Sequence, residues 1–277
     1  MPGIRGPLAS QRGFALLIVL WSVALLAMLG TAVTAVGRAD AQVAANLRGN
    51  AVAEAAADGG VFTAIFHLLD RSATRWTADG TTWPLRLPGA AVQVTLLDEH
   101  AKVPLNYAPV TVLAVLLVEL GADPPTATTL AARIAAWRGG NQKIGGAAPY
   151  LAAGRVWGPP ERPFRAAEEL SLVLGMQAEL VGRLVPHVTV FTSRVPSPGT
   201  TDPIVARALT RLSEGGIRLL GFDEPPVVTV VATAVAGGGA RFTRMAVVRI
   251  SASASHPFEL LDWRELTTMP DRLAVPG

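Results

Sequence analysis

The sequence predicts an α+β protein in which one long N-terminal helix packs on an antiparallel sheet and a large all-helical segment interrupts the strands. Three observations indicate this fold. Residues 14–70 contain no proline and repeat apolar side chains at intervals of three and four, as a helix does. Alternating apolar and polar residues, typical of strands, occur near residue 95 and again beyond residue 226. Residues 109–190 have helical character, so an insertion explains this order better than two consecutive domains.

Composition and charge exclude several classes of protein. The 277 residues suffice for one large domain or two small ones. A net charge of +3 gives no strong indication of a nucleic-acid or acidic partner. The chain has no cysteine, which excludes a disulfide framework and a cysteine-ligated metal site.

The first element is an apolar stretch long enough to cross a membrane. Residues 14–37 number 24 and carry no charge. As a helix they would extend about 36 Å, and the hydrocarbon core of a bilayer is about 30 Å thick. The preceding leader, residues 1–13, contains Arg5 and Arg12 and no acidic residue, which predicts that it stays on the cytoplasmic side.

Three interpretations of this stretch compete. A secretory signal peptide could be cut after Ala39-Asp40-Ala41, but its apolar region would be too long and charges would lie inside the cleavage region. An ordinary membrane anchor fits the apolar run. The third interpretation starts from Arg12-Gly13-Phe14, where a short basic leader meets an unbroken apolar helix.

This last arrangement resembles the type IV pilin family. In that family a dedicated membrane peptidase cuts after the glycine and methylates the new N-terminal amine. The resemblance implies that a prepilin peptidase cuts between Gly13 and Phe14 and that Phe14 becomes N-methylated.

The helix is expected to continue to about residue 70, a length of about 55 residues. Its first half is apolar on all sides, and its second half carries one main apolar stripe. A membrane helix that runs directly into an amphipathic helix favours packing on a soluble domain, because a plain anchor more often ends at a flexible linker.

The segments after this helix differ in their periodicity. Residues 71–88 are expected to form a loop because threonine, proline and glycine interrupt any pattern there. Residues 91–98 predict a half-buried strand with Val92, Val94 and Leu96 on its buried face.

The middle of the chain predicts helices. We expect them over 110–120 and 126–137, followed by a glycine-rich loop over 139–158 and two short helices around Gly175.

The chain then returns to β structure. A short strand is expected over 188–191, and longer strands over 227–235, 241–250 and 258–266. The glycines of 236–239 suit the turn between two of these strands, because glycine readily adopts positive φ.

No arrangement of side chains predicts catalysis or a metal site. The histidines are far apart in sequence and are expected at the surface or as caps; they are His67, His100, His187 and His256. The chain contains no Gly-x-Ser-x-Gly motif of a serine hydrolase. We therefore expect no catalytic residue, no metal ligand and no enzymatic activity.

Two acidic pairs also have simple interpretations. Asp98 and Glu99 would point to opposite faces of a strand, so we interpret them as a solvated strand end. Glu168 and Glu169 at the start of a helix suit its dipole and need no further role.

Four stretches carry a second, more specific resemblance: Arg12–Trp21, Asp98–Pro109, Pro163–Phe191 and Phe258–Glu265. Together they resemble the family of type II secretion system protein K, also called general secretion pathway protein K. The second stretch contains Leu105-Asn106-Tyr107-Ala108-Pro109, which is similar to a motif of that family. The four come in the family's order and span nearly the whole chain.

The resemblance implies a minor pseudopilin at the tip of the type II secretion pseudopilus. It implies a single-pass protein of the inner membrane with a periplasmic C-terminal domain. The implied partners are the minor pseudopilins I and J, the prepilin peptidase and inner-membrane lipid. The expected parts are the prepilin leader 1–13, the transmembrane helix 14–37, the amphipathic helix and first part of a pilin-like domain 38–108, an inserted all-helical domain of the helix-hairpin-helix or SAM-like kind 109–190, and the rest of the pilin-like domain 191–277.

One position departs from ordinary pilins. They carry a glutamate five residues into the mature chain, and this chain has Ile18 there. In the family that buried carboxylate is thought to pair with the N-terminal amine of a neighbouring subunit, since an unpaired charge in lipid is unfavourable. A subunit with Ile18 suits the topmost position of a filament, where no subunit lies above it.

A calcium site is associated with the family, but this chain lacks the residues for one. Relatives usually carry several acidic residues after the tryptophan that corresponds to Trp137. Residues 138–146 contain no carboxylate and two cations. Because Ca²⁺ usually requires carboxylate ligands, we expect no cofactor or metal in this loop.

The alternative function is a membrane-anchored nucleic-acid-binding protein, for example in DNA uptake. Residues 172–184 resemble a helix-hairpin-helix, but only Gly175 of the usual two glycines is present. Glutamates at 168, 169 and 179 flank it where a phosphate-binding hairpin would have basic residues. This favours a packing hairpin, and we expect no nucleic acid as a partner.

Overall fold

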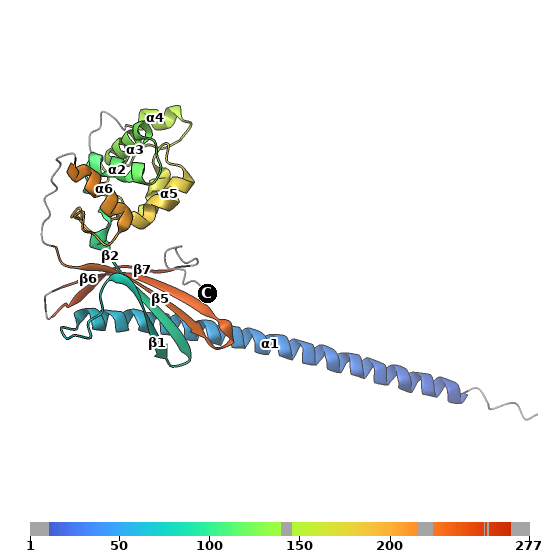
Figure 1. Cartoon of the computed structure of the whole chain (residues 1–277). Helices are drawn as coiled ribbons and strands as arrows, with labels where there is room; N and C mark the ends of the chain where they lie inside the picture. The colour runs from blue at the N-terminus through green and yellow to red at the C-terminus, as the bar shows by residue number, and fades with distance from the viewer. Residues whose placement is uncertain (1–10, 140–145, 215–223, 252, 254, 267–277) are drawn as a thin grey trace, which may run out of the picture.

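The computed structural model of the protein describes residues 11–139, 146–214, 224–251, 253 and 255–266. A long helix, α1 (Gln11–Leu69), lies along one face of a five-stranded sheet, and most of the remaining helices lie beyond the opposite face (Figure 1). The N-terminal half of α1 extends far beyond the sheet (Figure 1). This arrangement confirms the predicted α+β fold.

The sheet is antiparallel and has the order β1-β2-β5-β6-β7. Its strands are β1 (Asp79–Leu87), β2 (Ala90–Asp98), β5 (Val227–Ala236), β6 (Arg241–Ile250) and β7 (Phe258–Glu265). The predicted strands match β2, β5, β6 and β7 to within two residues. Gly238 and Gly239, in the connection between β5 and β6, have φ values of 79° and 83°, as the turn requires.

Small side chains let α1 approach the sheet closely. Its buried residues recur at helical spacing and are mostly alanines: Ala53, Ala56, Ala57, Val61, Ala64, Ile65 and Leu68. They face the fully buried side chains of Val92, Val94 and Leu96, the three predicted to share one face of the strand. At Gly60 an added Cβ would lie 2.9 Å from Cγ1 of Val92, so no larger residue fits there without a shift of the helix.

The predicted loop over residues 71–88 was wrong where β1 forms. Pro84 lies inside this strand and is opposite Gln93 of β2. Proline cannot donate a backbone hydrogen bond, but β1 is an outer strand of the sheet, and within the described part of the chain one of its edges has no partner strand. The local sequence signal for a loop was therefore overridden by the strand's position in the sheet.

A compact helical unit is inserted between β2 and β5. Its elements are α2 (Val110–Glu119), α3 (Pro124–Trp137), α4 (Ala147–Ala152), α5 (Ala178–Leu184) and α6 (Pro203–Glu214), with short 3-10 turns η1 (Glu99–Ala101), η2 (Ala167–Leu172) and η3 (Val185–His187). A further 3-10 turn, η4 (Gly237–Gly239), lies in the β5–β6 connection. The unit has its own core, which includes Leu113, Leu117, Leu130, Ile134, Leu184 and Leu209.

Two features of this unit differ from the expected bounds of the loop and the insertion. Helix α4 occupies part of the segment 139–158 that was expected to be loop, and its Tyr150 is buried with its hydroxyl accepting from the amide of Leu174 at 3.1 Å. Helix α6 lies beyond the expected end of the insertion at residue 190, yet Val205, Ala208 and Leu209 are part of the same core. Side chains distant in sequence bury these two helices.

The chain enters and leaves the main part of the insertion at one place. The short strand β3 (Val103–Pro104) pairs in parallel with β4 (Val188–Thr189), and the amide of Leu105 donates to the carbonyl of Thr189 at 2.8 Å. This pairing holds both ends of the segment between them beside the sheet.

Candidate functional site

The N-terminal half of α1 exposes a continuous apolar surface. The described segment Leu16–Thr31 is an apolar helix, and Trp21 is 70% exposed. Phe14 and Ile18 are also exposed, at 68% and 50%. Large apolar patches of this kind are covered in the functional state, by lipid or by another protein. This half of α1 is therefore the candidate site for membrane insertion and helix packing.

The second half of α1 has a different role. Residues 40–69 are also long and apolar enough to cross a membrane by composition. However, nearly half of the most apolar window of this helix is buried in the protein, where its alanine-rich face packs on β2, β5 and β6. This half of α1 therefore belongs to the folded domain, and the exposed half that precedes it is the candidate for membrane insertion.

The three sequence-predicted site residues lie close together at the start of α1. Gly13 and Phe14 lie two and three residues after the first helical residue, Gln11, so the helix begins slightly before the predicted cleavage position. Ile18 follows Phe14 by four residues, which puts both on one face of the helix. The peptidase cleavage and the N-methylation remain predictions.

Two of the stretches that carried the family resemblance are joined in the fold. Asn106 donates from Nδ2 to the carbonyl of Phe164 at 3.0 Å and accepts from the amide of Phe164 at 2.7 Å. The guanidinium of Arg138 donates to the carbonyls of Leu105 and Ala108. Burial lowers the pKa of Arg138. These side chains position a backbone turn.

The acidic pair at residues 168 and 169 has further contacts that the helix-dipole interpretation missed. Glu168 forms an ion pair with Arg264 of β7 at 3.2 Å and thereby links the helical unit to the sheet. Glu169 accepts a hydrogen bond from the amide of Arg165 at 3.2 Å and lies 3.5 Å from a guanidinium nitrogen of Arg162.

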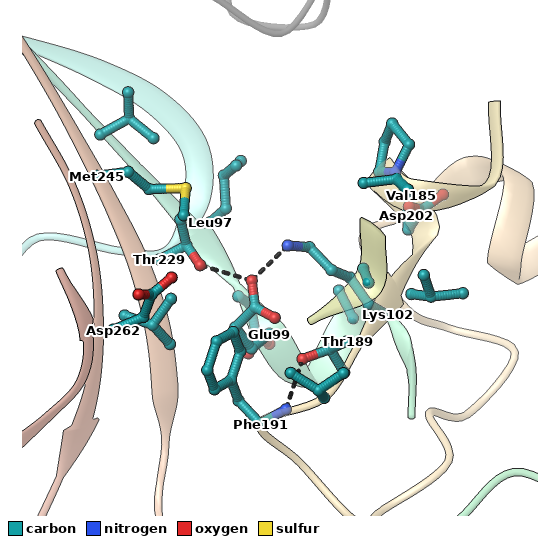
Figure 2. Close-up of a pocket in the computed structure, with 18 of the residues that line it drawn as sticks. Leu97, Glu99, Lys102, Val185, Thr189, Phe191, Asp202, Thr229, Met245 and Asp262 are labelled. Carbon is teal, nitrogen blue, oxygen red and sulfur yellow. Dashed lines mark hydrogen bonds and ion pairs between the residues drawn. The ribbon is translucent and has the colours of Figure 1, made fainter. Parts of the chain in front are cut away.

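The interpretation of Asp98 and Glu99 as a solvated strand end was wrong for Glu99. Its side chain is 2% exposed, and Oε1 accepts hydrogen bonds from Lys102 and from the hydroxyl of Thr229, the latter at 2.6 Å (Figure 2). Asp98 caps the turn η1 by accepting from the amide of His100 at 2.9 Å. The helical unit covers this end of β2, which the local sequence does not reveal.

A cavity of about 640 Å³ lies between the sheet and the helical unit, beside Glu99. It is on the face of the sheet opposite α1. Figure 2 shows Leu97, Thr229 and Met245 of the sheet on one side and Val185, Thr189 and Asp202 on the other.

His187 was expected at the surface or as a cap, and it is buried. It is 4% exposed, and Nδ1 lies 2.7 Å from Oδ2 of Asp202. Asp202 also accepts from the amide of Ile204 at 2.9 Å, at the start of α6. The pair therefore fixes the position of α6. Among the described residues, no three or more His, Cys, Asp and Glu side chains gather in a way that could hold a metal ion.

Two other predicted features can be located. The loop considered for calcium lies mostly at residues 140–145, outside the described part of the chain. In the hairpin near Gly175, the carbonyl of Leu174 accepts from Arg133 at 2.8 Å, and the amide of Met176 donates to the carbonyl of Val173 at 3.1 Å. Since the amide of Leu174 is also bonded within the fold, these groups are not open to a phosphate.

Comparisons with known proteins agree with this architecture. The family described as type II secretion system (T2SS), protein K matches residues 94–193. A solved structure titled the crystal structure of the GspK-GspI-GspJ complex from the enterotoxigenic Escherichia coli type 2 secretion system contains a similar chain. That chain is 18% identical, with a TM-score of 0.58, over 83% of this chain and 99% of its own length. No curated protein matches significantly.

Proposed function

We propose that this chain, in which residues 94–193 match the family of type II secretion system protein K, is a minor pseudopilin that occupies the tip of the secretion pseudopilus and starts its assembly. One observation carries the proposal. An exposed apolar half-helix continues without a break into a helix packed on a sheet, and a bulky helical unit lies beyond the sheet's other face (Figure 1).

The exposed half of α1 would serve two functions in turn. Before assembly it would hold the protein in the inner membrane by residues 14–37, with the sheet and helical unit in the periplasm. After cleavage at Gly13, the same apolar surface would pack on the helices of neighbouring pseudopilins. Burial of such side chains contributes about 1.5–3 kcal/mol each, so a few of them suffice for a stable contact.

Two features suit the topmost position. Ile18 cannot offer a carboxylate to the N-terminal amine of a neighbouring subunit, and in a lipid environment an unpartnered carboxylate would be unfavourable. The helical unit adds bulk that would sterically block the addition of a subunit above it. Growth would then proceed only from below.

The partners follow from the related structure. Its title names a complex of GspK with GspI and GspJ, and we propose that this chain forms the corresponding complex with the minor pseudopilins I and J. The protein would act as a structural component of the secretion apparatus and not as an enzyme.

The N-terminus and the mass of the mature protein, produced together with a prepilin peptidase, test the first step. We expect a chain that begins with methylated Phe14. A terminus near Gln42 would indicate a signal peptide and a free periplasmic protein, and an uncut chain would indicate an ordinary anchor. Either of these results would remove the basis of the tip proposal.

Co-purification with pseudopilins I and J tests the second step. The expected result is a complex of the three proteins that requires the cleaved chain. A correctly processed protein that binds neither partner would contradict the proposed place at the tip while leaving the pilin-type maturation intact.

A further inference from the structure

The cavity between the sheet and the helical unit has the size and lining of a small-molecule site. Its volume of about 640 Å³ lies within the range of about 300–1,000 Å³ found for ligand pockets. Apolar side chains from the sheet form one wall, among them Val231, Met245 and Val247. Val185, before β4, contributes an apolar side chain on the opposite side, and the ring of Phe191, after β4, lies beside Glu99 (Figure 2).

One carboxylate oxygen in this lining accepts no hydrogen bond from the described residues. Glu99 is 2% exposed and lines the cavity, and both of its hydrogen bonds, from Lys102 and Thr229, go to Oε1. Among the described residues, none donates to Oε2. Hydrogen bonds to a charged acceptor are among the stronger ones, so a ligand that brings a donor to this oxygen should bind more tightly than one that does not.

The charges around Glu99 determine which donor fits. Lys102 already neutralises the carboxylate, so a second cation placed beside it would be repelled by the ammonium group. An anion would be repelled by Glu99 itself. A neutral hydroxyl or amide N–H can donate to Oε2 without either penalty.

We propose that this cavity binds a small apolar molecule that carries a neutral hydroxyl or amide N–H, with the donor on Oε2 of Glu99 and the apolar body between Met245 and Val185. This binding site is separate from membrane insertion and from pseudopilus assembly. It can therefore fail or succeed independently of the proposed function.

Three probes with the same six-carbon body test the assignment: 1-hexanol, hexanoate and hexylamine. The full chain in lipid nanodiscs would be labelled with ¹³C at the methionine methyl groups. Met245 lines the cavity, whereas Met176 packs against the core of the helical unit and Met28 lies in the exposed apolar helix. Met28 therefore reports partition into lipid, and Met176 reports a general change of the fold.

We expect 1-hexanol to shift the Met245 resonance to saturation and to leave Met176 unchanged. Hexanoate and hexylamine should bind at least about tenfold more weakly, because neither supplies a neutral donor. Equal binding of all three probes, or tightest binding of hexylamine, would overturn the assignment of the donor. No saturable shift of Met245 with any probe would overturn the site.

Two variants that leave the charge of the protein unchanged test whether the probe binds in the cavity. Val247→Phe adds bulk to the cavity wall and should abolish the hexanol shift. Leu151→Phe, on the exposed surface of α4, should leave it unchanged. A Val247→Phe protein that keeps a native spectrum and still binds 1-hexanol would show that the molecule binds elsewhere. If wild-type protein binds only after removal of residues 267–277, the tail is the occupant and the proposal is wrong.

Discussion

Arg244 of β6 donates from Nε to Oδ1 of Asp58 on α1 at a distance of 2.6 Å. Its second branch donates to Glu54, one turn earlier on the same helix, at 3.0 Å. The guanidinium also lies 4.7 Å from the ring centre of Phe242 and 5.1 Å from that of Trp263. With 8% of its surface exposed, Arg244 links the long helix to the sheet by charge and by stacking.

Replacing Arg244 with alanine should lower the free energy of unfolding by about 2 kcal/mol, because Asp58 would lose its partner at a partly buried position. Solvent screening keeps the loss below that of a fully buried pair. Arg249→Ala, also in β6, removes an exposed pair with Glu259 of β7 and should change the stability by less than about 0.5 kcal/mol. Urea unfolding followed by tryptophan fluorescence compares the two, and equal losses would contradict the link.

Gly60→Ala should destabilise the protein by about 1–2 kcal/mol. The new methyl group would lie within 3.3 Å of Val92, Val94 and Ala232, and overpacking of this kind exceeds the roughly 1 kcal/mol that alanine gains over glycine in a helix. Gly182→Ala in α5 has no atom within 4 Å of the added carbon and should stabilise slightly. Thermal unfolding of both variants measures the difference, and a stabilised Gly60→Ala protein would mean that α1 lies less close to the sheet.

Gly13→Ala should abolish processing by the prepilin peptidase if the chain matures like a pilin. The uncut protein would keep its leader and should be detected by its larger mass. Gly30→Ala is the matched control, since nothing lies within 4 Å of the added carbon on the same helix. It should be cut normally. Normal maturation of Gly13→Ala would refute the prepilin interpretation.

Ile18→Glu should be inserted and cut normally but should weaken the complex with pseudopilins I and J. A carboxylate at this position has no partner when the subunit is topmost, and its burial among apolar helices is unfavourable. Ile18→Leu preserves the apolar surface and should assemble as the wild type does. Pull-down of the partners measures the effect, and unchanged assembly of Ile18→Glu would count against the argument for the tip.

The carboxyl group of Asp70 should have an unusually low pKa. Ser72 donates to its carboxylate from both hydroxyl and amide, at 2.7 and 2.9 Å, and Thr74 donates at 2.7 Å, which lowers the pKa to about 2. Because the folded pKa is below the unfolded value of about 3.9, the stabilisation is present above pH 4 and is lost as the pH falls toward 2. An NMR titration should show this midpoint, and Ser72→Ala should raise it. Thr77→Ala, which affects Asp79, should leave the midpoint of Asp70 unchanged.

Much of the fold could be predicted because the periodicity of apolar residues along the sequence indicates most of its helices and strands. The helical period over residues 14–70 identified α1, and alternation identified β2, β5 and β6, since these elements each bury one face against a neighbour. The strand β1 could not be found in this way. Its Pro84 and threonines are typical of a loop. Proline is tolerated in this strand only because β1 lies at the edge of the sheet.

Some residues of the candidate site could be predicted from the sequence, and others could not. The sequence alone determined the apolar half-helix with Gly13, Phe14 and Ile18, because hydrophobicity and spacing along one segment suffice for it. Only the tertiary structure decided that Glu99 is buried beside a cavity. The hydroxyl that binds it belongs to Thr229, 130 residues away, and the helical unit closes over it. Burial of a polar side chain depends on partners that the local sequence does not contain, so it could be known only after the chain had folded.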